Sequence, residues 1–291
     1  MPKKILFVTN PNSGTSRSGI SEEAVRNHLS SEEWEIDFIE TQYAGNAKEI
    51  ASDAKNDMDI VVAIGGDGTV HEIASSIVDS DTALAIIPRG SGNGLSRFLG
   101  LPTRIEDSLK VISNFQVKLI DTIGINEFRF VNMAGIGFDA HIAHSFAGFG
   151  SRGFLSYGRL VLREFRKFGG VEVDLKMNGS GVQTEDAFLI SFANSSQYGN
   201  NAHIAPEAVI DDGLLDVCVM HKFPLYSSGN IAFRMFNRTL TTSKYYKSYR
   251  VSELSFQSKN PLFGHVDGEP IDLGKSGNIK VYPKSLKVIV P

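Results

Sequence analysis

The stretch GGDGTVHE, residues 65–72, places three glycines and an aspartate directly after the apolar run IVVAI. Because glycine has no side chain, the stretch favours either a tight turn or a close approach of the backbone to a ligand. Backbone N–H groups at a helix N-terminus attract anions, so the ligand would be a phosphate. Asp67 is unusual there, because a carboxylate repels phosphate unless Mg²⁺ or water lies between them. Both interpretations stay open for this stretch alone.

A second glycine-rich stretch, PRGSGNGLSR at 88–97, repeats the order of apolar strand, glycine turn and expected helix. It adds the hydroxyl of Ser91 and the amide of Asn93. A third polar stretch, NPNSG at 10–14, also follows an apolar run. In open parallel sheets, ligands bind outside the carboxyl ends of the strands. The three stretches together therefore favour a phosphate site.

Two stretches in the C-terminal half contain Asp-Gly, which by itself favours an ordinary hairpin turn. VDGEP at 266–270 holds Asp267 and Glu269, which would face the same side of an extended segment. PEAVIDDGLLDV at 206–217 holds Asp212.

The elements that position the first three stretches alternate between strand and helix. We expect strands at 3–11, 35–42, 59–66 and 83–94, the last including its glycine-rich exit, and helices at 20–31, 46–56 and 69–80. This order predicts a parallel sheet with right-handed crossovers, which is a Rossmann-like α/β domain.

The pattern changes near Val117, where many short strands separated by turns indicate an antiparallel β-sandwich. We expect strands at 117–125, 128–138, 171–177, 186–194, 214–220, 254–259, 277–283 and 286–291, and helices near 156–168 and 227–240. The sequence thus predicts two domains, an α/β domain at 1–118 and a β-rich domain at 119–278, followed by a C-terminal strand at 279–291.

The composition, with 42% hydrophobic and 21% charged residues, is typical of a globular protein. The net charge of −4 argues against general nucleic-acid binding. The single cysteine, Cys218, fits a reducing compartment. No stretch is apolar enough for a signal peptide or a membrane span, so we expect a cytoplasmic location.

The ordered set of motifs resembles the diacylglycerol kinase catalytic-domain family, which includes soluble bacterial lipid kinases and the sphingosine and ceramide kinases. NPNSG, Thr41 after a strand, GGDGTVHE, PRGSGNGLSR, PEAVIDDGLLDV and VDGEP carry the resemblance over nearly the whole chain. It implies an active site in a cleft between an α/β nucleotide domain and a β-rich domain, and a final strand that returns to the first domain.

The resemblance also implies roles for residues. Asp267 matches the general base that takes the proton from a lipid hydroxyl, with Glu269 beside it. A structural Mg²⁺ would be bound by Asp212 and by the carbonyl groups of Val209 and Leu214, with Asp121 in its water network. ATP would be held by Asn10, Thr41, Gly65, Gly66, Asp67, Gly68, Thr69, Val70, His71, Glu72, Gly90, Ser91 and Asn93.

The acceptor lipid is less clearly indicated. Soluble bacterial diacylglycerol kinases commonly have Asn-Asp where this chain has Asn93-Gly94, and GSGNGL is closer to sphingosine and ceramide kinases. Asp139 lies where sphingosine kinases hold a headgroup-binding aspartate, although a capping role is the simpler interpretation. We expect diacylglycerol as the acceptor and phosphatidic acid as the product, with a sphingoid base or ceramide as the alternative.

Two other functions compete with a lipid kinase. A NAD kinase shares GGDGT but requires a different motif after the second glycine turn. A silent nucleotide- or lipid-binding regulator need not keep both GGDGT and Asp267. The expected lipid substrate lies at a membrane surface. Aromatic and basic residues at 154–168 fit either a helix that packs against the protein with a solvated basic face or a peripheral membrane contact. A homodimer is a further candidate assembly.

Overall fold

The computed structural model describes residues 2–13, 20–147, 161 and 163–291. It divides into two compact units, each described here by itself. Unit 1 comprises Met1–Thr122 and Tyr282–Pro291, and unit 2 comprises Ile123–Val281. Within the described residues, no helix combines the length and the hydropathy needed to cross a bilayer.

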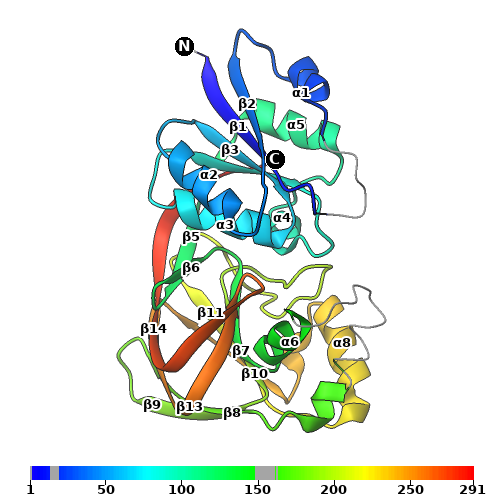
Figure 1. Ribbon diagram of the computed structural model, residues 1–291. Coiled ribbons are helices and arrows are strands. Elements are labelled where there is room, and N and C mark those ends of the chain that lie inside the picture. Colours follow the sequence, from blue (N-terminus) through cyan, green and yellow to red (C-terminus); the bar gives the residue numbers. More distant parts are fainter. Residues whose placement is uncertain (1, 14–19, 148–160, 162) are drawn as a thin grey trace. The chain divides into compact units, whose positions relative to one another are not determined.

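Unit 1 is built on a parallel sheet in the order β4-β3-β1-β2 (Figure 1). Strands β3 and β4 are completely buried apolar runs, as expected where helices cover both faces, whereas the edge strand β2 alternates between buried and exposed residues at its start. The elements are β1 Lys3–Thr9, α1 Glu22–His28, β2 Trp34–Glu40, α2 Asn46–Ala54, β3 Ile60–Gly65, α3 Asp67–Ile77, β4 Ala83–Pro88, α4 Gly94–Phe98 and α5 Ile105–Asn114.

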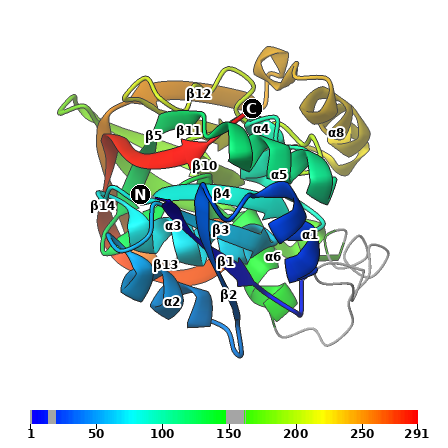
Figure 2. The same cartoon turned by 90° about the horizontal axis from the view of Figure 1, so that it is seen from above.

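The two faces of this sheet are covered by different helices (Figure 2). Ile5 and Phe7 of β1 pack in one core with Val25 of α1 and Leu109 of α5. Figure 2 shows α2 and α3 on the other side of the strands. This arrangement confirms the predicted α/β architecture and brings the ends of β1, β3 and β4 to one edge.

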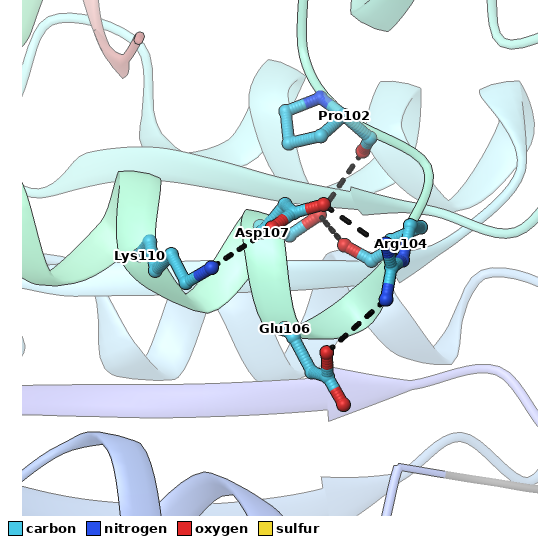
Figure 3. A network of polar contacts seen from close by, with 6 residues as sticks. Pro102, Arg104, Glu106, Asp107 and Lys110 are labelled. Carbon is cyan, nitrogen blue, oxygen red and sulfur yellow. Dashed lines mark hydrogen bonds and ion pairs between the residues drawn. The ribbon is translucent and has the colours of Figure 1, made fainter.

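A small polar network fixes the start of α5 after the loop that leaves α4 (Figure 3). Arg104 precedes the helix without a side-chain cap, and the Ser108 hydroxyl donates to the carbonyl groups of Pro102 and Arg104. Arg104 also lies near Glu106 and Asp107, the acidic residues of the first helical turn. Acidic side chains at a helix N-terminus favour its dipole, although exposed pairs contribute little energy.

Unit 2 contains an antiparallel succession β12-β11-β10-β7-β13-β14, in which β14 spans Glu269–Ile289, with β8 beside β13 and β9 beside β8. Its elements are β6 Phe128–Phe130, β7 Met133–Gly137, α6 Phe138–Ala147, β8 Val171–Met177, β9 Val182–Ala187, β10 Leu189–Ala193, β11 Leu215–Met220, the 3₁₀ turn η1 Leu225–Ser227, α8 Ser228–Phe236, the 3₁₀ turn η2 Leu240–Thr242, β12 Tyr246–Val251 and β13 Glu253–Val266.

Strand β11 shows how unit 2 is layered. Val217 and Val219 join a core shared with β8 and β13, whereas Cys218 and Met220 join a second core shared with α6 and α8. Alternate side chains of a strand point to opposite faces, so β11 is buried on both sides. The predicted β-sandwich is therefore confirmed.

The chain passes between the units within continuous strands. β5 runs from Val117 to Ile125, and β14 runs from Glu269 to Ile289. The divisions after Thr122 and before Tyr282 therefore fall inside strands, a few residues beyond the limits expected from the sequence. Within unit 1, the end of β14 pairs in parallel with β4 through Lys287 and Val288.

Several expected elements differ from the observed ones. The run 128–138 is divided into β6 and β7, and α6 begins at Phe138. Strand β12 was not expected. The basic and aromatic segment 154–168 is described only in part: Phe154, Tyr157 and Arg159 lie outside the described residues, whereas Phe165 is buried in the core beside α6.

Candidate functional site

The two glycine-rich stretches of unit 1 pack against each other. A Cβ atom on Gly90 would lie 2.6 Å from the Cα of Gly66, and one on Gly66 would lie 3.3 Å from the Cα of Gly90. A Cβ atom on Gly65 would meet the Thr69 side chain at 2.4 Å. Side chains are thus excluded from these positions by the protein's own backbone and side chains.

Asp67 joins the same two stretches through hydrogen bonds. Its Oδ2 accepts the N–H of Asn93 at 2.8 Å, and its Oδ1 accepts the N–H of Gly94 at 2.7 Å. Asn93 is buried in the left-handed conformation and donates its side-chain amide to the Gly90 carbonyl. The carboxylate therefore fixes the second glycine-rich stretch at the start of α4.

The end of β1 is tied to α3 by Asn10. Its Nδ2 donates to the Thr69 hydroxyl at 3.2 Å, and its Oδ1 accepts the Asn12 N–H at 2.9 Å. Thr41 is buried at the end of β2, where its N–H donates to the Thr9 carbonyl. The exits of β1, β3 and β4 therefore meet around the N-terminus of α3.

That helix terminus has the features of an anion site. No described side chain caps α3, whose N-cap residue is Gly66. Its first N–H groups and its dipole thus favour a negatively charged group. Ser91 is exposed in the neighbouring stretch, and His71 is half-buried, whereas Val70 is buried and points into the core. The backbone at this terminus can therefore bind an anion such as a phosphate group.

Glu72 contacts another helix. Its two carboxylate oxygens accept the N–H groups of Gly45 and Ala47 at 3.0 and 3.1 Å. It thereby caps α2, whose own N-cap, Gly45, has no side chain. The structure gives Glu72 a role in joining α2 to α3.

In unit 2, Asp267 and Gly268 form the two-residue turn between β13 and β14. Both have positive φ, 49° and 94°, and Val266 pairs with Glu269 across the hairpin. Asp-Gly is the sequence that such turns favour. In contrast to an ordinary turn residue, Asp267 is only 8% exposed.

Three consecutive backbone N–H groups hold the Asp267 carboxylate. Oδ1 accepts from Asn132 at 2.9 Å and from Met133 at 2.8 Å, and Oδ2 accepts from Val131 at 3.1 Å. Because the N–H groups of Val131, Asn132 and Met133 point to the Asp267 side chain, the strand expected at 128–138 is interrupted between β6 and β7. The donors stabilise the buried charge and fix its position.

Glu269 does not share this environment, which corrects the expected geometry. Asp267 and Gly268 are turn residues, so 267 and 269 do not belong to one extended segment. Glu269 is exposed at the first position of β14.

Asp139, at the start of α6, is the centre of a buried polar cluster. Its Oδ2 lies 3.1 Å from the Tyr198 hydroxyl, 3.3 Å from His265 Nε2 and 3.4 Å from the Ser191 hydroxyl. Its Oδ1 accepts the N–H of Ala140 at 2.8 Å. The carboxylate is thus already surrounded by polar groups from β10, from β13 and from the loop that follows β10.

The partners of Asp139 were missed from the sequence. Burial and the charge of Asp139 raise the pKa of Tyr198 well above its usual range, so this hydroxyl stays a donor. His265 lies two residues before Asp267, and its Nε2 faces Asp139. Among the described residues, its buried Nδ1 has no hydrogen-bond partner. The spacing of His265 and Asp267 was the available signal.

The two carboxylates among the expected metal ligands have protein partners. Asp212 is paired with Arg250, and its Oδ1 accepts the Leu214 N–H at 3.0 Å. The Val209 side chain is exposed, and Asp121, in unit 1, accepts the Lys284 N–H at 2.7 Å. The described residues contain no group of three or more His, Cys, Asp or Glu that could hold a metal. Asp212 and Asp121 thus both have protein partners, whereas none of these contacts involves the carbonyl groups of Val209 and Leu214, so the Mg²⁺ site stays a prediction.

The fold and the site together define a class, in which an α/β unit with a glycine-rich anion site accompanies a β-sandwich with a buried carboxylate. The profile of the diacylglycerol kinase catalytic domain matches residues 4–125. That of the YegS C-terminal NAD kinase beta sandwich-like domain matches residues 132–290. The chain belongs to the diacylglycerol kinase catalytic-domain family of lipid kinases, with a YegS-type C-terminal domain.

Relatives agree with this assignment. A protein of Yersinia pestis named probable lipid kinase YegS-like is 26% identical, over 100% of this chain and 98% of its own. A protein of Stenotrophomonas maltophilia with the same name is 26% identical, over 85% of this chain and 84% of that protein.

Solved structures show the same fold. A diacylglycerol kinase from Bacillus anthracis has a TM-score of 0.76 at 20% identity, covering 99% of this chain and 97% of its own. Yeast NADH kinase has a TM-score of 0.57 at 11% identity, and the match covers 100% of this chain and 84% of that one.

Proposed function

We propose that this protein is an ATP-dependent kinase that phosphorylates a lipid hydroxyl, with diacylglycerol as the acceptor and phosphatidic acid as the product. The observation that carries the proposal is the buried carboxylate of Asp267, held by three N–H groups in a chain of the lipid kinase family. Sphingoid bases and ceramide are the alternative acceptors.

Unit 1 supplies the nucleotide site in this proposal. The uncapped N-terminus of α3 would bind ATP phosphates, with Gly66 and Gly68 leaving the backbone accessible. Asn10 and Thr41 would border the nucleotide. Asp67 and Glu72 would act indirectly, because their carboxylates hold the neighbouring backbone in place.

Asp267 would orient the lipid hydroxyl and accept its proton. Phosphoryl transfer has a loose transition state, so positioning contributes more than proton abstraction. A carboxylate stabilised in its charged form and fixed by backbone donors suits that task. Mg²⁺ would neutralise phosphate charge when it accompanies ATP, and the proposal places no cation on residues 209–214.

The test is transfer of label from γ-labelled ATP in mixed micelles that offer diacylglycerol, sphinganine, ceramide or NAD. We expect label in diacylglycerol and a loss of about a hundredfold or more in Asp267→Asn. The matched control is Asp272→Asn, which removes an exposed carboxylate from the same hairpin strand. Label in NAD, or equal transfer by both variants, would contradict the proposal.

Because Asp267→Asn also removes an acceptor from three N–H groups, its fold must be checked by thermal unfolding and its ATP affinity by titration. A folded variant that binds ATP but transfers no label assigns the loss to the chemical step. If the wild type binds ATP and labels no acceptor, the silent-regulator alternative is favoured.

A further inference from the structure

Unit 2 contains a long segment with basic residues and no acidic residue. Between Asp216 and Glu253 the chain contains no Asp or Glu, although the whole protein has a net charge of −4. This segment includes η1, α8, η2 and β12. Its basic residues are Lys222, Arg234, Arg238, Lys244, Lys247 and Arg250.

Three large aromatic side chains of this segment are exposed. Tyr226 is 87% exposed, Phe233 is 61% exposed and Phe236 is 59% exposed. Phe233 and Phe236 are three residues apart in α8, so they are neighbours on the helix surface, and Tyr226 lies in η1, the turn that leads into the helix. Ile231 of α8 is 4% exposed and packs in the core. The helix is thus held by one side and presents aromatic residues on another.

The basic residues of α8 and of the chain that follows it have uncharged partners among the described residues. Arg234 donates to Asn230, to the Thr239 carbonyl and to Thr242, which are all uncharged. Lys244 lies 5.1 Å from the ring of Tyr245. In the described part of the chain, no ion pair links Arg234, Arg238 or Lys244 to an acidic side chain.

Lys247 and Arg250, farther along the segment, do have acidic partners in Glu185 and Asp212. The positive charge is therefore uncompensated at the α8 surface, which we define as Tyr226, Phe233, Phe236, Arg234, Arg238 and Lys244.

We propose that the α8 surface docks on an anionic lipid bilayer. Exposed aromatic side chains beside uncompensated cations match the chemistry of a membrane interface, where rings enter the headgroup region and cations attract anionic lipid. A second copy of this chain fits less well, because a symmetric contact through this surface would bring like charges together. An acidic protein partner is the competing occupant.

The docking surface does not depend on the kinase activity, and it is distinct from the segment 154–168 considered from the sequence. Combined with the proposed function, it would hold the enzyme at the membrane that contains its lipid substrate. Its test uses vesicles without ATP and without an acceptor lipid, so that failure of the kinase proposal leaves the result interpretable.

The first experiment is co-sedimentation of the full chain with vesicles of phosphatidylcholine plus phosphatidylglycerol, compared with phosphatidylcholine alone. We expect binding to the anionic vesicles that weakens with added salt. Phe233→Ser/Phe236→Ser and Arg234→Glu/Lys244→Glu should each weaken it by about tenfold or more. Matched controls in unit 2 are Val182→Ser, at an exposed apolar residue, and Lys259→Glu, at an exposed lysine.

A second experiment reports on the location directly. Trp34 is the only tryptophan and is buried in unit 1, so Phe236→Trp adds a distinguishable fluorophore. We expect its emission to shift to the blue with anionic vesicles, whereas that of the wild type stays unchanged. Absence of vesicle binding, or equal binding by the wild type and both double variants, would overturn the proposal and leave an acidic protein as the occupant to consider.

Discussion

Asp67 accepts the backbone N–H groups of Asn93 and Gly94 at 2.8 and 2.7 Å, and so links the two glycine-rich stretches of unit 1. The aspartate that was unusual in a phosphate cradle is thus explained by its protein partners. A carboxylate can satisfy both donors at once, because each of its oxygens is an acceptor.

Replacing Asp67 by asparagine should disturb both loops. The amide offers one acceptor oxygen, so one of the two N–H groups would face an NH₂ group. We expect the free energy of unfolding to fall by about 1–3 kcal/mol and the Kd for ATP to rise by about tenfold. Isothermal titration and denaturant unfolding measure both, with the exposed Glu106→Gln as control. Unchanged ATP affinity would show that this link does not shape the nucleotide site.

Alanine at position 90 should be more harmful than alanine at position 66. The added Cβ of Gly90→Ala would lie 2.6 Å from backbone, whereas that of Gly66→Ala would lie 3.3 Å from its nearest neighbour. We expect a loss of about 1–3 kcal/mol for Gly90→Ala. Thermal unfolding of both variants checks whether Gly90→Ala is the more destabilising. The control Gly181→Ala should leave stability nearly unchanged, because its added Cβ atom would have no neighbour within 4 Å. The reverse order would contradict the packing of the two loops.

Asp139→Asn separates two roles for that carboxylate. If Asp139 mainly organises Tyr198, Ser191 and His265, the variant should lower the free energy of unfolding by about 1–3 kcal/mol. Tyr198→Phe should show a smaller loss, because the other donors remain. Differential scanning calorimetry of both variants tests this order. An undiminished melting temperature with a raised KM for an amino-alcohol lipid would instead support headgroup binding.

Cys218 should be unreactive in the folded protein. It is fully buried, and burial raises the pKa of its thiol to about 12, from 9.0 in the reference state. The unfolded chain loses the thiol proton near pH 9, whereas the folded protein keeps it until about pH 12. The thiol therefore leaves the free energy of unfolding unchanged below pH 9 and lowers it as the pH rises toward 12. We expect slow labelling by a disulfide reagent at pH 8 until denaturant is added.

The variant Cys218→Ala tests the sign of the pH effect. Above pH 9 its unfolding free energy should fall less steeply than that of the wild type, by about 1.4 kcal/mol per pH unit. Parallel curves for the two proteins would contradict a raised thiol pKa.

Magnesium alone should not stabilise the protein. Asp212 is already engaged by Arg250 and by the Leu214 N–H, so a cation at 209–214 would have to displace them. We expect no shift in melting temperature with Mg²⁺ unless ATP is present. A shift without ATP that is absent in Asp212→Asn would establish a site in this segment.

The order of elements and the class of site could be predicted from local patterns. Apolar runs and helical spacing act within a few residues, so β1, β3, β4 and α3 lie close to where the sequence predicted them. Gly66, Asp67 and Gly90 were singled out by type alone. Their mutual contacts were not foreseen, since these depend on how neighbouring strands end.

Distant polar partners required the tertiary structure. His265 of β13 pairs with Gly135 of β7, and Gly135 lies beside the Asp139 carboxylate. This register brings the imidazole to Asp139, although the two residues are 126 positions apart in the sequence. A shift of one residue would turn His265 to the other face of the sheet. No local spacing encodes this register.

The sequence by itself determined the strands, the glycine-rich exits and the Asp-Gly turn, because each follows from backbone preferences of adjacent residues. Only the tertiary structure decided that Asp67 is a loop link, that Glu72 caps α2 and that Asp267 is buried in a nest of N–H groups. Burial and hydrogen-bond partners of a charged side chain are set by residues far along the chain, which meet only when the sheets are assembled.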